Sequence, residues 1–135
     1  MKVINTINDI LNLAGNYKNK SDDYLVLWES YIKDLPHIRQ LCYEDMLDHK
    51  QMDYVYRDAN YALTHGLDKL KLASDNFDKA ISEIGLHFNS FCPCGNQITI
   101  YFYMGLSNAA GWATSIGEEG AILIGGGESA CSRLA

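Results

Sequence analysis

The 135-residue sequence predicts an α+β fold, with four or five helices followed by a small, mostly antiparallel sheet of three strands. A change of pattern along the chain predicts this order. Residues 1–90 repeat apolar side chains at intervals of three and four, as amphipathic helices do. Residues 97–127 instead alternate, or form short apolar runs between glycines, as strands do. Because the length suits one domain, we expect both parts to pack as a single unit.

Two helices are predicted before the first proline. Residues 2–14 form the first, and Gly15 is suited to end it. Its apolar positions at helical intervals are Val3, Ile7, Ile10, Leu11 and Ala14. Residues 23–35 form the second, and either Asp22 or Asp23 can cap its first turn. Its apolar face consists of Leu25, Trp28, Tyr31 and Ile32.

Further helices follow Pro36, which ends the second helix and is well placed in the first turn of the third. After Asp48 the pattern is ambiguous, since either the third helix continues or a fourth begins near Gln51. Gly66 marks a break or a weak point. Ser74 is the best helix cap in the sequence, because it is followed at helical intervals by Phe77, Ala80, Ile81, Ile84 and Phe88.

The strands are predicted in the last third of the chain. Residues 97–104 alternate, with Ile98, Ile100, Phe102 and Met104 on one face and Thr99, Tyr101 and Tyr103 on the other. The apolar run at residues 121–124 suits a strand covered on both faces. Glu118 and Glu119 are expected in a hairpin turn. The connections are short and contain glycine, which favours antiparallel pairing because a parallel crossover needs a longer link.

Composition excludes several classes of partner. The net charge of −6 argues against nucleic acid, whose phosphates an acidic protein repels. No run approaches the roughly 18 apolar residues that would span a membrane. Asn5, Asn8 and Asn12 interrupt the N-terminal apolar residues, so no secretory signal is predicted. We therefore expect a cytoplasmic protein with reduced cysteines.

The potentially reactive side chains do not assemble into a predicted catalytic or metal site. Cys92 and Cys94 form a single C-x-C pair, whereas structural zinc usually needs two closely spaced pairs, and Cys42 and Cys131 have no paired neighbour. No two histidines among His37, His49, His65 and His87 form an H-E-x-x-H motif. Ser107 lacks the second glycine of a nucleophile elbow, because Ala109 occupies that position. We expect no catalytic residue, no bound metal and no cofactor in this chain.

Two stretches together resemble a known family. They are DDYLVLWESYIKDLPHIRQLCYEDM, Asp22 to Met46, and ITIYFYMGLSNAAGWATSIGEEGAILIGGGE, Ile98 to Glu128. Their order and separation resemble the N-terminal portion of a family of predicted zinc-dependent bacterial proteases of zincin type. In that family a helical region leads to a strand, a Gly-Leu-x-Asn…Gly-Trp turn and a second apolar strand.

The resemblance implies the helical and sheet half of a zincin-like protease. A complete member would continue to a helix bearing H-E-x-x-H, which binds zinc and activates water. This sequence contains no such motif, so it is expected to be inactive as written and to represent an incomplete domain, shortened naturally or by truncation or frameshift. In such enzymes a sheet strand lines the cleft and pairs with extended substrate. The resemblance places Asn108, Gly111, Trp112 and Ala113 near that edge.

Two other functions remain open. The first is a non-enzymatic interaction module that binds a peptide, a protein or a second copy through an exposed sheet edge. An aromatic helical face with Tyr54, Tyr56 and Tyr61 is another candidate surface for it. The second alternative is a small cysteine-dependent redox or metal protein.

Overall fold

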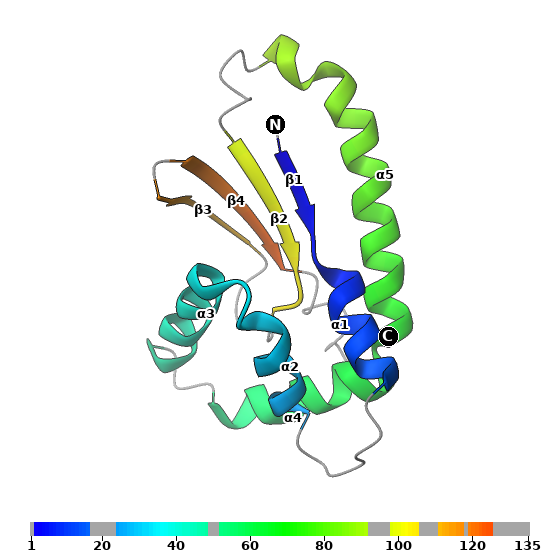
Figure 1. The fold of residues 1–135 in the computed structure, drawn as a ribbon, viewed down its shortest axis with the longest axis vertical. Coiled ribbons are helices and arrows are strands. Elements are labelled where there is room, and N and C mark those ends of the chain that lie inside the picture. Colours follow the sequence, from blue (N-terminus) through cyan, green and yellow to red (C-terminus); the bar gives the residue numbers. More distant parts are fainter. Residues whose placement is uncertain are drawn as a thin grey trace.

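A computed structural model shows the fold for residues 2–16, 24–48, 52–91, 98–105, 111–117 and 119–125. The described residues form five helices and a four-stranded sheet, which confirms the α+β class (Figure 1). In chain order the elements are β1 (Lys2–Asn5), α1 (Ile7–Asn16), α2 (Leu25–Ile32), α3 (Pro36–Asp48), α4 (Met52–His65), α5 (Leu67–Phe91), β2 (Ile98–Tyr103), β3 (Gly111–Ile116) and β4 (Glu119–Gly125).

The sheet is mixed, with strand order β1-β2-β4-β3, so the prediction of a three-stranded, mostly antiparallel sheet after all the helices was wrong. Strand β1 lies at the N-terminus, where the sequence pattern predicted helix. It pairs in parallel with β2, and Val3 lies opposite Ile100. Four residues are too few to show a strand period, and their partner lies at the other end of the chain. Tertiary pairing therefore decides the conformation here.

The short connections are compatible with parallel pairing because they do not join parallel neighbours. After β2 the chain passes to the far edge and forms β3, which pairs antiparallel with β4. Strand β4 then returns between β3 and β2 and pairs in parallel with β2. The predicted hairpin is therefore present. Glu119 is not in its turn but is the first residue of β4, opposite Ile116.

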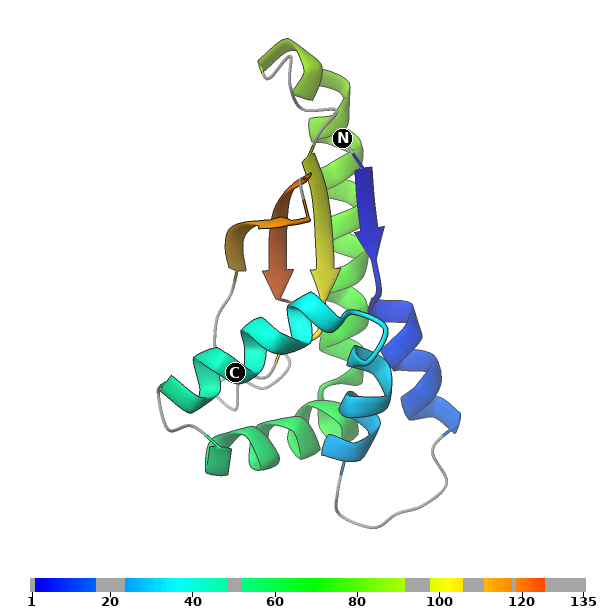
Figure 2. The same cartoon turned by 60° about the vertical axis from the view of Figure 1, so that its left-hand side comes forward.

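Helix α5 covers one face of the sheet, and the start of α3 reaches part of the other (Figure 1). Helix α5 runs behind the strands in Figure 2. Its Phe77 stacks on Phe102 of β2 with ring centroids 4.4 Å apart. The first turn of α3 lies on the other face, beside Tyr101 and Ile116. On this second face Thr99 and Tyr103 are buried, at 4% and 0% exposed.

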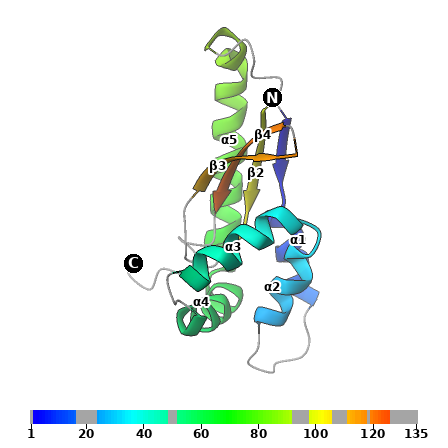
Figure 3. The same cartoon turned by 90° about the vertical axis from the view of Figure 1, so that its left-hand side faces the viewer.

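Helices α1 to α4 gather at one end of the sheet, towards which β1, β2 and β4 point (Figure 3). Helix α2 inserts its predicted apolar face, Leu25, Trp28, Tyr31 and Ile32, into the core. Its N-cap residue is Tyr24, which makes no side-chain cap. The Tyr24 amide donates instead to Oδ1 of Asn60 on α4, at 2.9 Å. The candidate caps Asp22 and Asp23 lie outside the described residues.

Helices α4 and α5 meet at the predicted break. Helix α4 ends at His65 and α5 begins at Leu67, with Gly66 between them. The prediction that Ser74 caps a helix was wrong, because α5 runs through it without interruption. Ser74 is buried within α5 and accepts a hydrogen bond from β1. Within the described ranges, no helix combines the length and apolarity needed to cross a bilayer.

Candidate functional site

Strand β3 forms one edge of the sheet, and among the described residues it pairs only with β4. Gly111, Ala113 and Ser115 alternate along it and are all exposed. An edge strand presents a row of backbone amide and carbonyl groups to which another chain can pair. The edge of β3 is therefore the first candidate for a binding surface.

The geometry of the hairpin indicates which β3 residues point outward. A Cβ built on Gly111 would lie 2.7 Å from the backbone oxygen of Leu123, so that carbonyl points towards β3. Backbone groups alternate in direction along a strand, and Leu123 lies opposite Trp112. Trp112, Thr114 and Ile116 therefore bond to β4. The amides and carbonyls of Gly111, Ala113 and Ser115 face the open edge.

The residues assigned by resemblance fall partly on this edge. Gly111, Trp112 and Ala113 are the first three residues of β3, and Gly111 and Ala113 are exposed. The side chain of Trp112 and the whole of Asn108 lie outside what the structure describes. The strand position is thus established for three of the four residues. Their role in binding remains a prediction.

A pocket of about 190 Å³ lies beside this edge, between the start of α3 and the sheet. Its lining includes the apolar side chains of Leu35, Pro36, Ile38 and Ile116, together with Tyr101. Asp34 and His37 are its polar lining residues, and both are exposed. Ile116 belongs to both the pocket and β3. The pocket is therefore continuous with the edge strand.

A buried polar network lies at the carboxyl ends of β1 and β2. The backbone amide and Oγ1 of Thr6 both donate to the carbonyl of Phe102, at 2.9 and 3.0 Å. The Tyr31 hydroxyl lies 2.6 Å from Thr6 Oγ1 and accepts the amide of Met104 at 3.0 Å. Since the Thr6 proton goes to Phe102, Tyr31 donates its own proton to Thr6. Trp28 completes the network, because its Nε1 donates to the carbonyl of Met104 at 2.9 Å.

This network is suited to holding strands and helices in place, not to proton transfer near neutral pH. Burial raises the pKa of Tyr31 from 10.0 to about 12, and the hydrogen bonds with Thr6 and Met104 oppose the shift only in part. A groove of about 440 Å³ between α1 and the end of α2 reaches the network at Thr6 and Tyr31. Asp9, Lys33 and Asp34 contribute charges of both signs to it.

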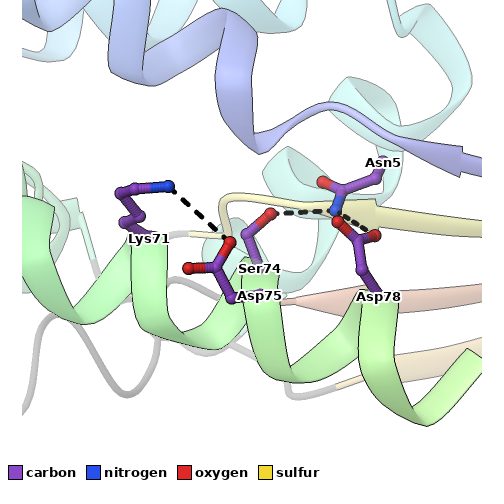
Figure 4. Close-up of polar contacts among 5 residues, drawn as sticks. All are labelled: Asn5, Lys71, Ser74, Asp75 and Asp78. Atoms are coloured by element: carbon purple, nitrogen blue, oxygen red, sulfur yellow. Dashed lines mark hydrogen bonds and ion pairs between the residues drawn. The ribbon is translucent and has the colours of Figure 1, made fainter.

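A second polar cluster joins β1 to α5 (Figure 4). The Asn5 side-chain amide donates to Ser74 Oγ at 2.9 Å and to Asp78 Oδ1 at 3.0 Å. Lys71 and Asp75 form an exposed pair with Nζ and Oδ1 3.7 Å apart. The carboxylate of Asp78 is thus used to position Asn5. This cluster is best explained as a structural joint.

The described residues contain no group of three or more histidine, cysteine or acidic side chains that could hold a metal ion. Cys42 is buried in the core, and His37, His65 and His87 are exposed. The other sequence candidates, namely Cys92, Cys94, Cys131, His49 and Ser107, lie outside the described residues. So do the side chains of Tyr54 and Tyr56, whereas Tyr61 is half-buried and stacks on His65 at 5.2 Å.

The pocket beside β3 was missed by sequence analysis. Its residues come from the α2–α3 connection, the start of α3, β2 and β3. Apart from His37, which was weighed only as a metal ligand, each had been assigned to the apolar or turn pattern of its own segment. Comparison of the chain with protein-family models, with curated proteins and with solved structures found no match.

Proposed function

We propose that this chain is the helical and sheet half of a zincin-like peptidase. It binds an extended peptide by adding the peptide as a strand to the open edge of β3. The observation that carries the proposal is the outward direction of the backbone groups of Gly111, Ala113 and Ser115 on an edge strand. Strand addition uses such groups for affinity and neighbouring pockets for specificity. Both features are present at β3.

The zincin-like resemblance supports the same edge on separate grounds. It implies substrate pairing near Asn108, Gly111, Trp112 and Ala113, and the last three of these begin β3. Strand β3 is an edge strand, which pairing with an extended substrate requires. The printed sequence has no H-E-x-x-H motif. The function proposed for these residues is accordingly peptide binding, without hydrolysis.

A matched pair of substitutions at Ala113 tests this proposal. Proline removes the amide proton, and at residue 113 this proton faces the open edge, so Ala113→Pro should leave the hairpin intact. Ala113→Val keeps the proton and is the control. With a fluorescent threonine-rich peptide, anisotropy should show binding to the wild type and to Ala113→Val, with a loss of at least about tenfold for Ala113→Pro. Equal affinity for all three proteins would contradict binding at this edge.

The predicted inactivity has its own test. Zinc content and peptide hydrolysis should both be measured on the purified chain, with a chelator-treated sample as control. We expect neither stoichiometric zinc nor cleavage. Stoichiometric zinc together with hydrolysis that the chelator abolishes would overturn the view that this chain only binds.

A second copy is the alternative occupant of the edge, as expected for a non-enzymatic interaction module. Two β3 strands could pair with each other through the same outward groups. Sedimentation velocity distinguishes this case. A dimer that Ala113→Pro dissociates would favour self-association, whereas a monomer at high concentration that still binds peptide would favour the first proposal.

A further inference from the structure

We infer that the bound peptide carries a large apolar side chain, which fills the pocket between α3 and Ile116, next to a basic residue. This inference rests on the proposed function and specifies the class of peptide. Its basis is the position of the pocket relative to β3. Ile116 is both the last residue of the edge strand and part of the pocket wall.

The direction of the Ile116 backbone groups determines which peptide residue lies next to the pocket. Its backbone groups bond to β4, so a peptide residue placed opposite it in antiparallel pairing would form a non-hydrogen-bonded pair, in which the side chains lie closest. Both side chains of such a pair point to the same face of the sheet. That face is the one on which α3 begins, because Ile116 and Tyr101 line the same pocket as Pro36 and Ile38.

The pocket size sets the type of side chain. A neighbouring strand lies about 4.8 Å outside β3, so a side chain as short as alanine cannot reach past Ile116. The volume of about 190 Å³ exceeds the roughly 150 Å³ of an apolar cavity that holds a benzene ring. Phenylalanine, leucine and methionine therefore satisfy both reach and volume. The apolar walls of Leu35, Pro36 and Ile38 disfavour a polar group.

The acidic residues near the pocket favour a basic residue next to the apolar residue of the peptide. Asp34 lines the pocket, and Glu119 lies opposite Ile116 in the hairpin; both are exposed. Residues 111–125 contain no lysine or arginine. A peptide with lysine beside its apolar residue would meet opposite charge, while one with glutamate would be repelled.

The experiment uses a threonine-rich fluorescent peptide with one central Phe and a Lys at each end. Replacing Phe by Ala should weaken binding by about tenfold to a hundredfold. Replacing both Lys by Glu should also weaken it, and added salt should reduce this difference. Ile116→Trp should fill the mouth of the pocket and lower the affinity for the Phe peptide to that for the Ala peptide. Ile116→Val is its matched control and should retain the preference for Phe.

The outcomes separate this inference from the function on which it rests. If no peptide binds the folded wild type, both fail. If Phe and Ala peptides bind equally, and Ala113→Pro abolishes both, strand addition stands and the pocket inference is overturned. If Ile116→Trp left the preference for the Phe peptide unchanged, the Phe side chain would bind somewhere other than this pocket. That result would also overturn the pocket inference. Equal binding of the Lys and Glu peptides would remove the basic residue from the proposed class.

Discussion

Asn5 at the end of β1 is hydrogen-bonded to Ser74 in the middle of α5, with Asn5 Nδ2 and Ser74 Oγ 2.9 Å apart. The same nitrogen donates to Asp78 Oδ1 at 3.0 Å, so both of its protons are used. The Asn5 Oδ1 accepts the amide of Ile7 at 3.1 Å, in the first turn of α1. One side chain therefore ends β1, begins α1 and positions α5.

Asn5→Ala is predicted to destabilise the fold. The substitution removes three hydrogen bonds and leaves buried Ser74 without its donor from β1. We expect the free energy of unfolding to fall by about 1–3 kcal/mol. Urea denaturation followed by circular dichroism measures this as a lower midpoint with an unchanged slope.

Lys71→Ala is the control for Asn5→Ala, because Lys71 lies on α5, the helix to which Asn5 is hydrogen-bonded. Its ion pair with Asp75 is exposed at both ends, so its loss should cost less than about 0.5 kcal/mol. If Asn5→Ala lowered the free energy of unfolding no more than Lys71→Ala, the Asn5 side-chain amide would not be what holds β1 to α5.

The Asn5–Ser74 pair also shows what sequence patterns can and cannot predict. Helices α2 and α3 were predicted well because their apolar intervals and Pro36 are local signals. Ser74 resembled a cap because serine before an apolar repeat usually is one. Its hydrogen-bond partner lies 69 residues away, and no local pattern contains that information. The parallel pairing of β1 with β2 was missed for the same reason.

The candidate site was predictable only in part. The resemblance implied a binding edge near Asn108, Gly111, Trp112 and Ala113; the last three lie in β3, an edge strand, and their role in binding stays a prediction. The insertion of β4 between β2 and β3 creates that edge, and the apolar run of β4 does not reveal its neighbours. The adjacent pocket joins Pro36, Tyr101 and Ile116, which are distant in sequence. Only the tertiary fold brings them together.

Tyr31→Phe is predicted to weaken the packing of α2 against the ends of β1 and β2. The phenol donates to Thr6 and accepts from the amide of Met104 within the core. Its removal leaves that amide without its acceptor, which should cost about 1–3 kcal/mol. Thermal and urea unfolding of Tyr31→Phe and the wild type measure the difference. An unchanged midpoint would show that water or another group replaces the hydroxyl.

Stability should also depend on Tyr31 at alkaline pH. The pKa of Tyr31 is raised from 10.0 in the unfolded chain to about 12 in the folded protein. The unfolded state therefore loses this proton first, and the folded state is disfavoured as pH rises from 10 towards 12. The Tyr31 contribution to the free energy of unfolding should fall by up to about 3 kcal/mol across that window. Below it the contribution is unaffected.

The comparison of Tyr31→Phe with the wild type isolates this effect. Urea unfolding at about pH 8 and about pH 11 should show a smaller alkaline loss in the variant, because it has no phenol to ionise at this position. Equal losses in the two proteins would show that Tyr31 does not ionise differently in the folded and unfolded states.

Proline at two neighbouring positions tests the direction of the β3 backbone. The amide of residue 113 faces the open edge, whereas that of residue 114 faces β4. Ala113→Pro should cost about 1 kcal/mol or less, while Thr114→Pro should cost about 3 kcal/mol or more because it removes a ladder hydrogen bond. Differential scanning calorimetry compares the two. The reverse order would mean that Ala113, and not Thr114, pairs with β4.

The β3–β4 hairpin depends on the backbone conformation of Gly117. Its φ is +64°, in the region that glycine adopts readily and that tight hairpin turns require. Among the described residues, and apart from Gly117 and its chain neighbours, no atom lies within 4 Å of where a Cβ on Gly117 would be, so the cost of a side chain is backbone strain. Gly117→Ala should therefore destabilise the fold by about 1 kcal/mol, and Gly117→Asn by less.

Gly85 is the matched control, because it has equally open surroundings but lies within α5. Gly85→Ala should raise the free energy of unfolding by about 0.5–1 kcal/mol, since alanine favours helix and glycine does not. The same chemical change should thus have opposite signs at the two positions. Urea midpoints that shift in the same direction would show that φ at residue 117 does not control the cost.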